Sequence, residues 1–267
     1  MSSKKELSET LGLSCVEKYF LAWLGRYYDV RRLYGNSFVS IGQVSNDFSR
    51  GATYENYCHI PRLQDIAEEY GVVRHSYQLC ETSEALKKIC AQTSDELCLI
   101  RVNTRFFLNF KRSSWREDHY VRVDKELNWL NEYPLSEGKF TAEEVGEIYD
   151  GAVCVYELSD LTAEPEDKTI EMIRRQSFPP PSINIGRFED AIGILRMTRK
   201  RMEKNLNLPD SAREVLRGEI ALLDRLYLFV SLREIKKKKG VRLSAETPEE
   251  ELGQILEYEK RLWEAVK

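Results

Sequence analysis

The apolar positions near the start of the chain recur with the period of a helix. In residues 13–28, large apolar side chains follow one another at intervals of three and four, which is typical of a buried helix. Ser14 is a favourable N-cap residue. The pattern therefore predicts a core helix with Cys15 in its first turn.

The next hundred residues lose this period and then adopt a shorter one. Residues 35–57 are rich in Gly, Ser, Asn and Tyr without helical spacing and predict a long ordered loop, and short helices are predicted at 60–71 and 83–92. Short runs of β-branched and aromatic residues then predict strands at 97–103, 119–124, 128–134 and 151–158. In the second of these strands, alternation places His119 on the same face as Val121 and Val123.

Helical periodicity returns after an acidic, proline-containing segment. The composition changes near residue 160, and three helices are predicted between residues 187 and 267. We therefore predict an α+β domain over residues 1–160 and a helical C-terminal region over residues 161–267. Helices, then strands, then helices fit this class better than a doubly wound sheet.

Charge and composition narrow the classes of function. The formal net charge is -4 and the sequence pI is about 5.7, which argues against a dedicated nucleic-acid binder. No stretch is apolar enough to cross a bilayer, and the N-terminus lacks the apolar core of a signal peptide, so we expect a cytoplasmic protein that binds no membrane. The six cysteines form no C-x-x-C pair, so neither a zinc site nor a redox pair is suggested. We expect no bound cofactor and no metal.

Cys15 is the candidate nucleophile. The free amides and the dipole at a helix start stabilise a thiolate, so we expect a lowered thiol pKa. The alternative interpretation is a small buried residue of the core helix.

Three histidines could serve as a base for Cys15, and His119 fits best. It opens a strand that leads into a hairpin, a scaffold that can hold an imidazole rigidly, whereas His59 and His75 are expected in surface segments. If residues 125–126 form the turn, His119 falls opposite Glu132, and a register one residue different brings Asn131 to it instead. Either side chain could fix the imidazole tautomer.

Charged runs offer weaker candidates. Residues 116–118 are expected to form a solvated loop or the lip of a cleft beside His119. The lysines at 236–239 are expected at a solvated helix end that could also contact an acidic partner.

The order of these candidates along the chain resembles papain-like cysteine enzymes. The Cys15 helix, LCLIRVNTRFFLNF, DHYVRV, WLNEYP and YDGAVCVYEL resemble the N-terminal domain of the butirosin-biosynthesis acyltransferase family, over roughly residues 10–158. The resemblance implies a papain-like fold in which a helix carries the Cys and an antiparallel sheet carries the His. It also implies acyl transfer from a carrier-protein thioester to an amine, with Cys15 as nucleophile and His119 as base. The third position falls at or beside Glu132, where Asn131 is also available.

Two positions depart from the expected pattern. Asn103 stands where the family suggests an Asp. Glu9 stands where papain-like peptidases carry a Gln that completes the oxyanion hole, and a carboxylate cannot stabilise an oxyanion. Because a thioester is already activated, this loss weighs less against acyl transfer than against peptide hydrolysis.

Three hypotheses follow. The first is an acyltransferase of natural-product biosynthesis that takes its acyl group from a phosphopantetheine thioester on an acyl or peptidyl carrier protein and passes it to a small-molecule primary amine. The second is a cysteine hydrolase, either peptidase or thioesterase, with the same Cys-His pair. The third is a non-catalytic binding module. For the first, a basic docking surface is expected at Arg196, Arg199, Lys200, Arg201 and residues 236–239.

Overall fold

The chain folds into two compact units, each assembled from two separate stretches of sequence. The computed structural model describes residues 14–35, 37–54, 57, 62–103, 119–132, 135–183, 185–239 and 249–267. The sheet unit comprises the described residues up to Val30 together with those of 62–165, and the helical unit comprises those of 31–61 and 166–267. Among the described residues, no helix is long and apolar enough to cross a membrane.

The division of the chain differs from the predicted one at residue 160. The sequence analysis assigned residues 31–61 to the first domain, whereas in the structure they pack with the C-terminal helices. Their apolar side chains include Val39, Ile41 and Val44, which belong to the same buried cluster as residues of the last three helices. Composition along the chain could not reveal this exchange, because the contacts join segments more than 130 residues apart in sequence.

An antiparallel sheet of six strands organises the sheet unit, in the order β1-β6-β2-β3-β4-β5. The strands are β1 (Val73–Leu79), β2 (Leu97–Val102), β3 (His119–Val123), β4 (Asn128–Glu132), β5 (Leu135–Lys139) and β6 (Tyr149–Leu158). The α+β class and the antiparallel sheet are thereby confirmed. Strands β1 and β5 were not predicted, and β5 alternates between exposed and half-buried positions and contains a glycine.

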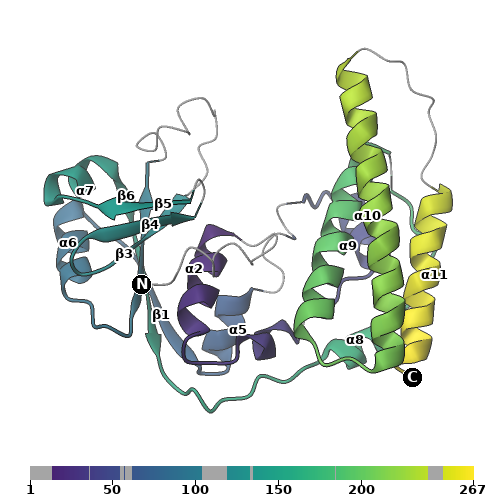
Figure 1. Cartoon of the computed structure of the whole chain (residues 1–267), viewed down its shortest axis with the longest axis horizontal. Coiled ribbons are helices and arrows are strands. Elements are labelled where there is room, and N and C mark those ends of the chain that lie inside the picture. The colour runs from purple at the N-terminus through teal and green to yellow at the C-terminus, as the bar shows by residue number, and fades with distance from the viewer. Residues whose placement is uncertain are drawn as a thin grey trace. The chain divides into compact units, whose positions relative to one another are not determined.

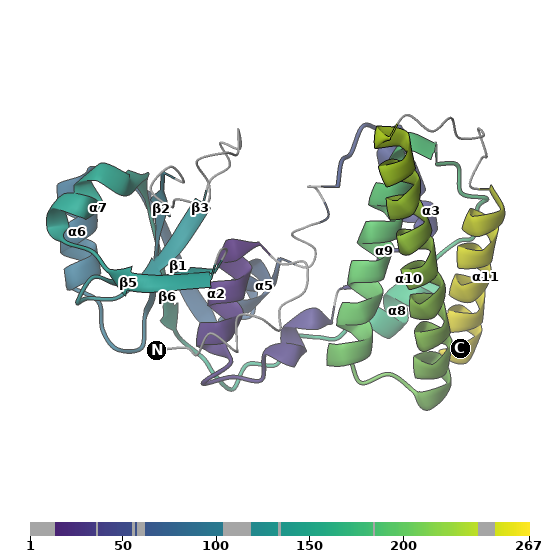
Figure 2. The same ribbon diagram turned by 45° about the horizontal axis from the view of Figure 1, so that its top comes forward.

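Helices cover both faces of this sheet (Figures 1 and 2). On one face, α6 (Thr82–Cys90) and α7 (Ala142–Ile148) pack on the alternate apolar residues of β2 and β3. On the other, α2 (Cys15–Leu24) packs against β2, β3 and β4, and α5 (Leu63–Glu69) packs against β1. Phe20 and Trp23 of α2 contact the ring of Tyr156 on β6, which anchors the helix to the second strand of the sheet.

The hairpin of β3 and β4 has a register that neither predicted alternative described. Val123 pairs with Trp129, and Arg122 with Leu130. The turn between them is longer than two residues: Asp124 accepts hydrogen bonds from following backbone amides, and Leu127 adopts a left-handed backbone with φ 64°. The extra residues displace β4 relative to β3, so neither Asn131 nor Glu132 lies directly across from His119.

Three long helices form the bulk of the helical unit: α9 (Ile185–Asn205), α10 (Asp210–Lys238) and α11 (Glu249–Ala265). These are the three helices predicted between residues 187 and 267, and they are confirmed. The short helix α8 (Thr169–Arg175) and the 3-10 helix η1 (Val30–Tyr34) were not predicted.

The predicted long loop at 35–57 contains a helix, α3 (Ile41–Ser49), so that prediction was wrong. Ser40 caps the helix, because its hydroxyl accepts a hydrogen bond from the Gln43 amide at 3.0 Å. Ile41, Val44 and Phe48 are buried against α9 and α11, at spacings of three and four. The helix is short and polar between these positions, which hid its period in the sequence.

Candidate functional site

Cys15 lies at the first position of α2, and a reciprocal capping box fixes that helix end. The Ser14 hydroxyl accepts a hydrogen bond from the Glu17 amide at 3.2 Å, and the Glu17 carboxylate accepts one from the Ser14 amide at 3.1 Å. Ser14 was predicted as the cap and is confirmed. Because both ends of the first turn are tied to each other, the backbone that carries Cys15 is held in one conformation.

The half-buried thiol of Cys15 meets the start of strand β3. The backbone amide of Tyr120 donates a hydrogen bond toward the sulfur, and Tyr120 is the residue that follows His119. The thiol of the candidate nucleophile therefore lies against the β3 backbone, one residue along the chain from the candidate base. A backbone donor of this kind leaves no trace in the amino-acid sequence, so sequence reasoning could not find it.

The pKa of Cys15 moves in the direction opposite to the one expected. Burial raises the pKa of the thiol to about 11, and the negative charge of Glu132 adds to the rise. The amides of Tyr120 and Val16 and the charge of Lys18 act the other way without overcoming the loss of solvation. The expectation of a lowered pKa was wrong, because it counted the helix start but not the strands that cover the thiol.

His119 and Asn131 form a short side-chain hydrogen bond, with 2.6 Å between His119 Nε2 and Asn131 Oδ1. Asn131 is fully buried on β4. When the amide oxygen accepts, Nε2 carries the ring proton and Nδ1 is the unprotonated ring nitrogen. Asn131 thus favours the tautomer in which Nδ1 can act as a base.

Glu132, the other candidate to orient His119, points to a different partner. Its carboxylate lies 2.6 Å from Lys18 Nζ on α2. Adjacent strand residues face opposite sides of a sheet, so Asn131 and Glu132 cannot both reach His119. The Tyr19 hydroxyl donates to the Leu130 carbonyl at 2.9 Å, so two successive residues of α2 are tied to β4.

Lys18 is a site residue that the sequence analysis missed. It lies one helical turn after Cys15, and this spacing places both side chains on the same side of α2. That spacing is a signal the sequence does contain. Its relevance to the site depends on the contact between Lys18 and Glu132, which the sequence does not show.

A second sulfur–imidazole contact lies elsewhere on the sheet. His75 Nε2 is 3.0 Å from Cys154 Sγ, and the His75 ring stacks on Tyr156. His75 lies on the edge strand β1, whose residues after Val73 are mostly exposed, and its own side chain is half-buried. Cys154 is buried, and burial raises the pKa of its thiol to about 11, so the thiol keeps its proton at neutral pH.

The expected basic docking surface is mostly not available at the surface. Arg199 and Arg201 are buried, and Arg196 and Lys200 both pair with the carboxylate of Asp224. Lys239 is exposed. Glu9, His59, residues 116–118 and the side chains of residues 236–238 lie outside the described residues.

In the described residues, the Cys15 thiol lies against the backbone amide of Tyr120, and the His119 imidazole is hydrogen-bonded to the buried Asn131 amide on β4. This set of groups suits nucleophilic chemistry at a carbonyl carbon. Within the described ranges, no three His, Cys, Asp or Glu side chains converge as metal ligands would.

Comparison with known proteins adds no relative. No protein family, curated protein or solved structure matches this chain.

Proposed function

We propose that the protein is a papain-like cysteine acyltransferase that forms an acyl-enzyme on Cys15. One observation carries the proposal. The Cys15 thiol lies at a capped helix start against the backbone amide of Tyr120, and Nε2 of the preceding residue, His119, is hydrogen-bonded to the buried Asn131. Cys15 acts as nucleophile, His119 as base, and Asn131 orients His119. Glu132 has no orienting role in this proposal, because it pairs with Lys18.

The reaction proceeds by two successive transfers at one sulfur. The Cys15 sulfur attacks the carbonyl carbon of a thioester while His119 Nδ1 accepts the thiol proton. The carbon–sulfur bond to the carrier breaks, and the imidazolium returns the proton to the departing thiol. An amine then attacks the acyl-enzyme, His119 takes the amine proton, and the amide leaves as that proton returns to the Cys15 sulfur.

The raised pKa of Cys15 determines how the first step occurs. With a pKa of about 11, the thiol keeps its proton at neutral pH. The nucleophile is then formed only as His119 removes the proton, and not in advance as a stable ion pair. A thioester tolerates this arrangement better than an amide does, because its carbonyl is more electrophilic and its leaving group is a weaker base.

The proposed donor is a phosphopantetheine thioester on a carrier protein, and the proposed acceptor is a small-molecule primary amine. Both follow from the resemblance noted in the sequence and from the chemistry of a neutral thiol with a general base. No cofactor needs to be bound by the chain itself in this proposal, because the carrier supplies the phosphopantetheine group.

The test is to incubate the protein with an acylated carrier protein, with and without amine, and to follow the acyl group by intact-protein mass spectrometry. We expect an acyl adduct that amine discharges faster than water does. Cys15→Ser should carry no thioester-linked acyl group. Cys90→Ser, which removes an exposed cysteine of α6, should still form the adduct. Release of free acid at the same rate without amine would indicate a hydrolase, and absence of any adduct would favour a binding module.

A further inference from the structure

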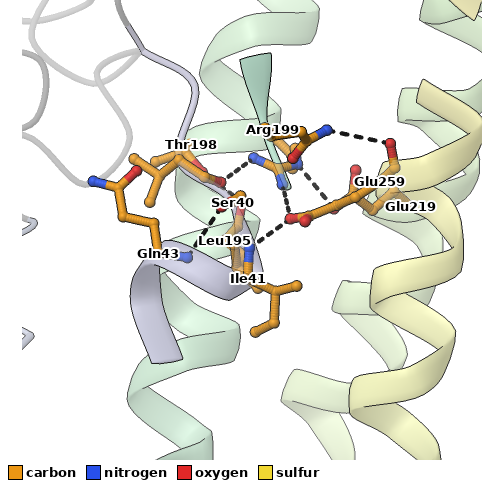
Figure 3. A network of polar contacts seen from close by, with 10 residues as sticks. Ser40, Ile41, Gln43, Leu195, Thr198, Arg199, Glu219 and Glu259 are labelled. Atoms are coloured by element: carbon orange, nitrogen blue, oxygen red, sulfur yellow. Dashed lines mark hydrogen bonds and ion pairs between the residues drawn. The ribbon is translucent and has the colours of Figure 1, made fainter. Parts of the chain in front are cut away.

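The centre of the helical unit holds three charged side chains with almost no solvent contact. Arg199 of α9 and Glu219 of α10 are 0% exposed, and Glu259 of α11 is 1% exposed. Figure 3 shows them converging between the helices. A charge removed from water is costly unless it is paired and hydrogen-bonded, so the contacts of this trio decide its state.

Arg199 uses all three of its guanidinium nitrogens. Nε donates to Glu219 Oε1 at 2.8 Å and Nη2 to Glu259 Oε1 at 2.7 Å. Nη1 donates to the backbone carbonyl of Val39 at 2.7 Å, and the guanidinium lies over the ring of Phe38. The cation is thus bound by both carboxyl groups and by the segment that precedes α3.

Glu259 makes a second contact with that segment. Its Oε1 accepts a hydrogen bond at 2.7 Å from the amide of Ile41, the first residue of α3 (Figure 3). Val39, Phe38 and Ile41 all belong to residues 31–61, which leave the sheet unit after α2 and return to it at α5. The trio therefore binds this inserted segment to α9, α10 and α11.

The charges of the trio do not balance when both carboxyl groups are ionised. One guanidinium faces two carboxylates, and Glu219 Oε2 is buried without a hydrogen-bond partner among the described residues. Two neutral groups complete the contacts of Glu259: α3 contributes the Ile41 amide, and Gln176, which follows α8, donates its side-chain amide to the backbone carbonyl of Glu259. A bound proton would make the cluster neutral.

The pKa directions agree with a bound proton. Burial raises the pKa of Glu259 to about 8, against the opposing effect of Arg199, and the charge of Glu219 adds to the rise. Burial also raises the pKa of Glu219. Both carboxyl groups therefore compete for a proton at neutral pH.

We propose that Arg199, Glu219 and Glu259 form a proton-linked lock, in which the two carboxyl groups hold one proton between them only while the described residues of 31–61 are packed on α9, α10 and α11. When the segment detaches, Phe38, Val39 and Ile41 no longer cover the cluster, and the proton is released to water. Detachment is thus coupled to proton release, and a lower pH holds the segment more tightly.

The sign and the pH window follow from linkage. The packed state keeps a proton that the opened state, with an ordinary Glu pKa near 4.5, releases. The equilibrium constant for opening should then rise up to about tenfold per pH unit between about 4.5 and 8. Above about 8 both states have lost the proton, and the dependence should level off.

Hydrogen exchange of the α3 amides in the full chain tests the lock. After correction for intrinsic exchange rates, we expect opening of α3 to be up to about hundredfold more frequent at pH 7.5 than at pH 5.5. Glu219→Gln keeps an oxygen to accept from Arg199 but cannot ionise, so the variant should stay protected at both pH values. Glu257→Gln, on the exposed side of α11, should behave as the unmodified protein does.

Two results would overturn the lock: α3 protection in the unmodified protein that does not change with pH, or the same pH dependence in Glu219→Gln. If Glu219→Gln does not fold, Glu259→Gln serves instead, because its amide oxygen can still accept from Ile41 and Arg199. The slope of unfolding free energy against pH, measured with denaturant, gives an independent count of the protons released.

Discussion

At the scale of single residues, the state of Cys15 determines which chemistry the site can perform. Position at a helix start lowers a thiol pKa and burial raises it, and in this structure burial dominates. The Cys15 thiol therefore stays protonated and unreactive until a base removes its proton.

The rate at which iodoacetamide alkylates Cys15 should therefore rise with pH and reach half of its maximum at a pH of about 11. The rate is measured for Cys15 by peptide mass spectrometry between pH 6 and 11.5, with a small free thiol of pKa about 8.5 as reference. At pH 8 we expect Cys15 to react well over tenfold more slowly than the reference. A profile that coincides with that of the free thiol would show that the strands do not desolvate the sulfur.

Asn131 and Glu132 should differ sharply when replaced one at a time. Asn131→Ala leaves His119 Nε2 without its oxygen acceptor, and we expect acylation of Cys15 to slow by at least about tenfold, with about 1–3 kcal/mol of stability lost. Glu132→Gln removes a charge that raises the pKa of Cys15 and leaves the His119 contact intact, so acylation should slow little or become faster. Acylation is timed by quenched-flow mass spectrometry. Equal losses in the two variants would refute the assignment of Asn131 as the orienting residue.

At the scale of elements, the site depends on how firmly α2 is joined to the sheet. The capping box fixes the first turn, and Lys18 and Tyr19 attach the helix to β4. The position of the sulfur is therefore a property of the helix end as much as of Cys15.

Two capping boxes in the sheet unit allow a matched test of this idea. Ser14→Ala and Thr141→Ala each remove the capping hydroxyl of one box, at α2 and at α7 respectively. Each should cost about 1 kcal/mol of unfolding free energy, measured by urea titration. We expect only Ser14→Ala to slow the acylation of Cys15. Comparable slowing by Thr141→Ala would mean that global stability, and not the helix end, controls the site.

The sequence revealed elements with a strong period and missed those whose partners are distant. The helix that begins at Cys15, its cap at Ser14 and the three C-terminal helices follow from local spacing and capping chemistry. Strand β1 was missed because its residues after Val73 are mostly exposed and polar. Local rules left two candidate partners for His119, namely Asn131 and Glu132. They did not anticipate the register of the hairpin, which the long turn at residues 124–127 sets.

At the scale of the whole molecule, the two units exchange segments of chain. The sheet unit is interrupted after Val30 and resumes at Arg62, and the intervening residues complete the core of the helical unit. The buried trio of Arg199, Glu219 and Glu259 lies where this segment packs against the last three helices.

Replacing the central cation should weaken the helical unit far more than replacing a surface one. Arg199→Met leaves two buried carboxyl groups without their counter-ion and should cost about 3–5 kcal/mol of unfolding free energy at pH 7.5. Arg217 lies on α10, as Glu219 does, but it is exposed and pairs with Glu203. Arg217→Met should therefore cost less than about 1 kcal/mol of unfolding free energy. Both are measured by denaturant titration with hydrogen exchange to separate the units. A loss below 1 kcal/mol for Arg199→Met would show that the trio contributes little to folding.

The exchange of segments also affects how the chain emerges during synthesis. Ile41, Val44 and Phe48 leave the ribosome well before α9, α10 and α11, which are to cover them. At roughly 5–20 residues per second, the wait for α11 is on the order of ten seconds or more. Throughout that interval the nascent polypeptide exposes an apolar, helix-forming stretch without its native partners, and exposed apolar stretches are what chaperones bind.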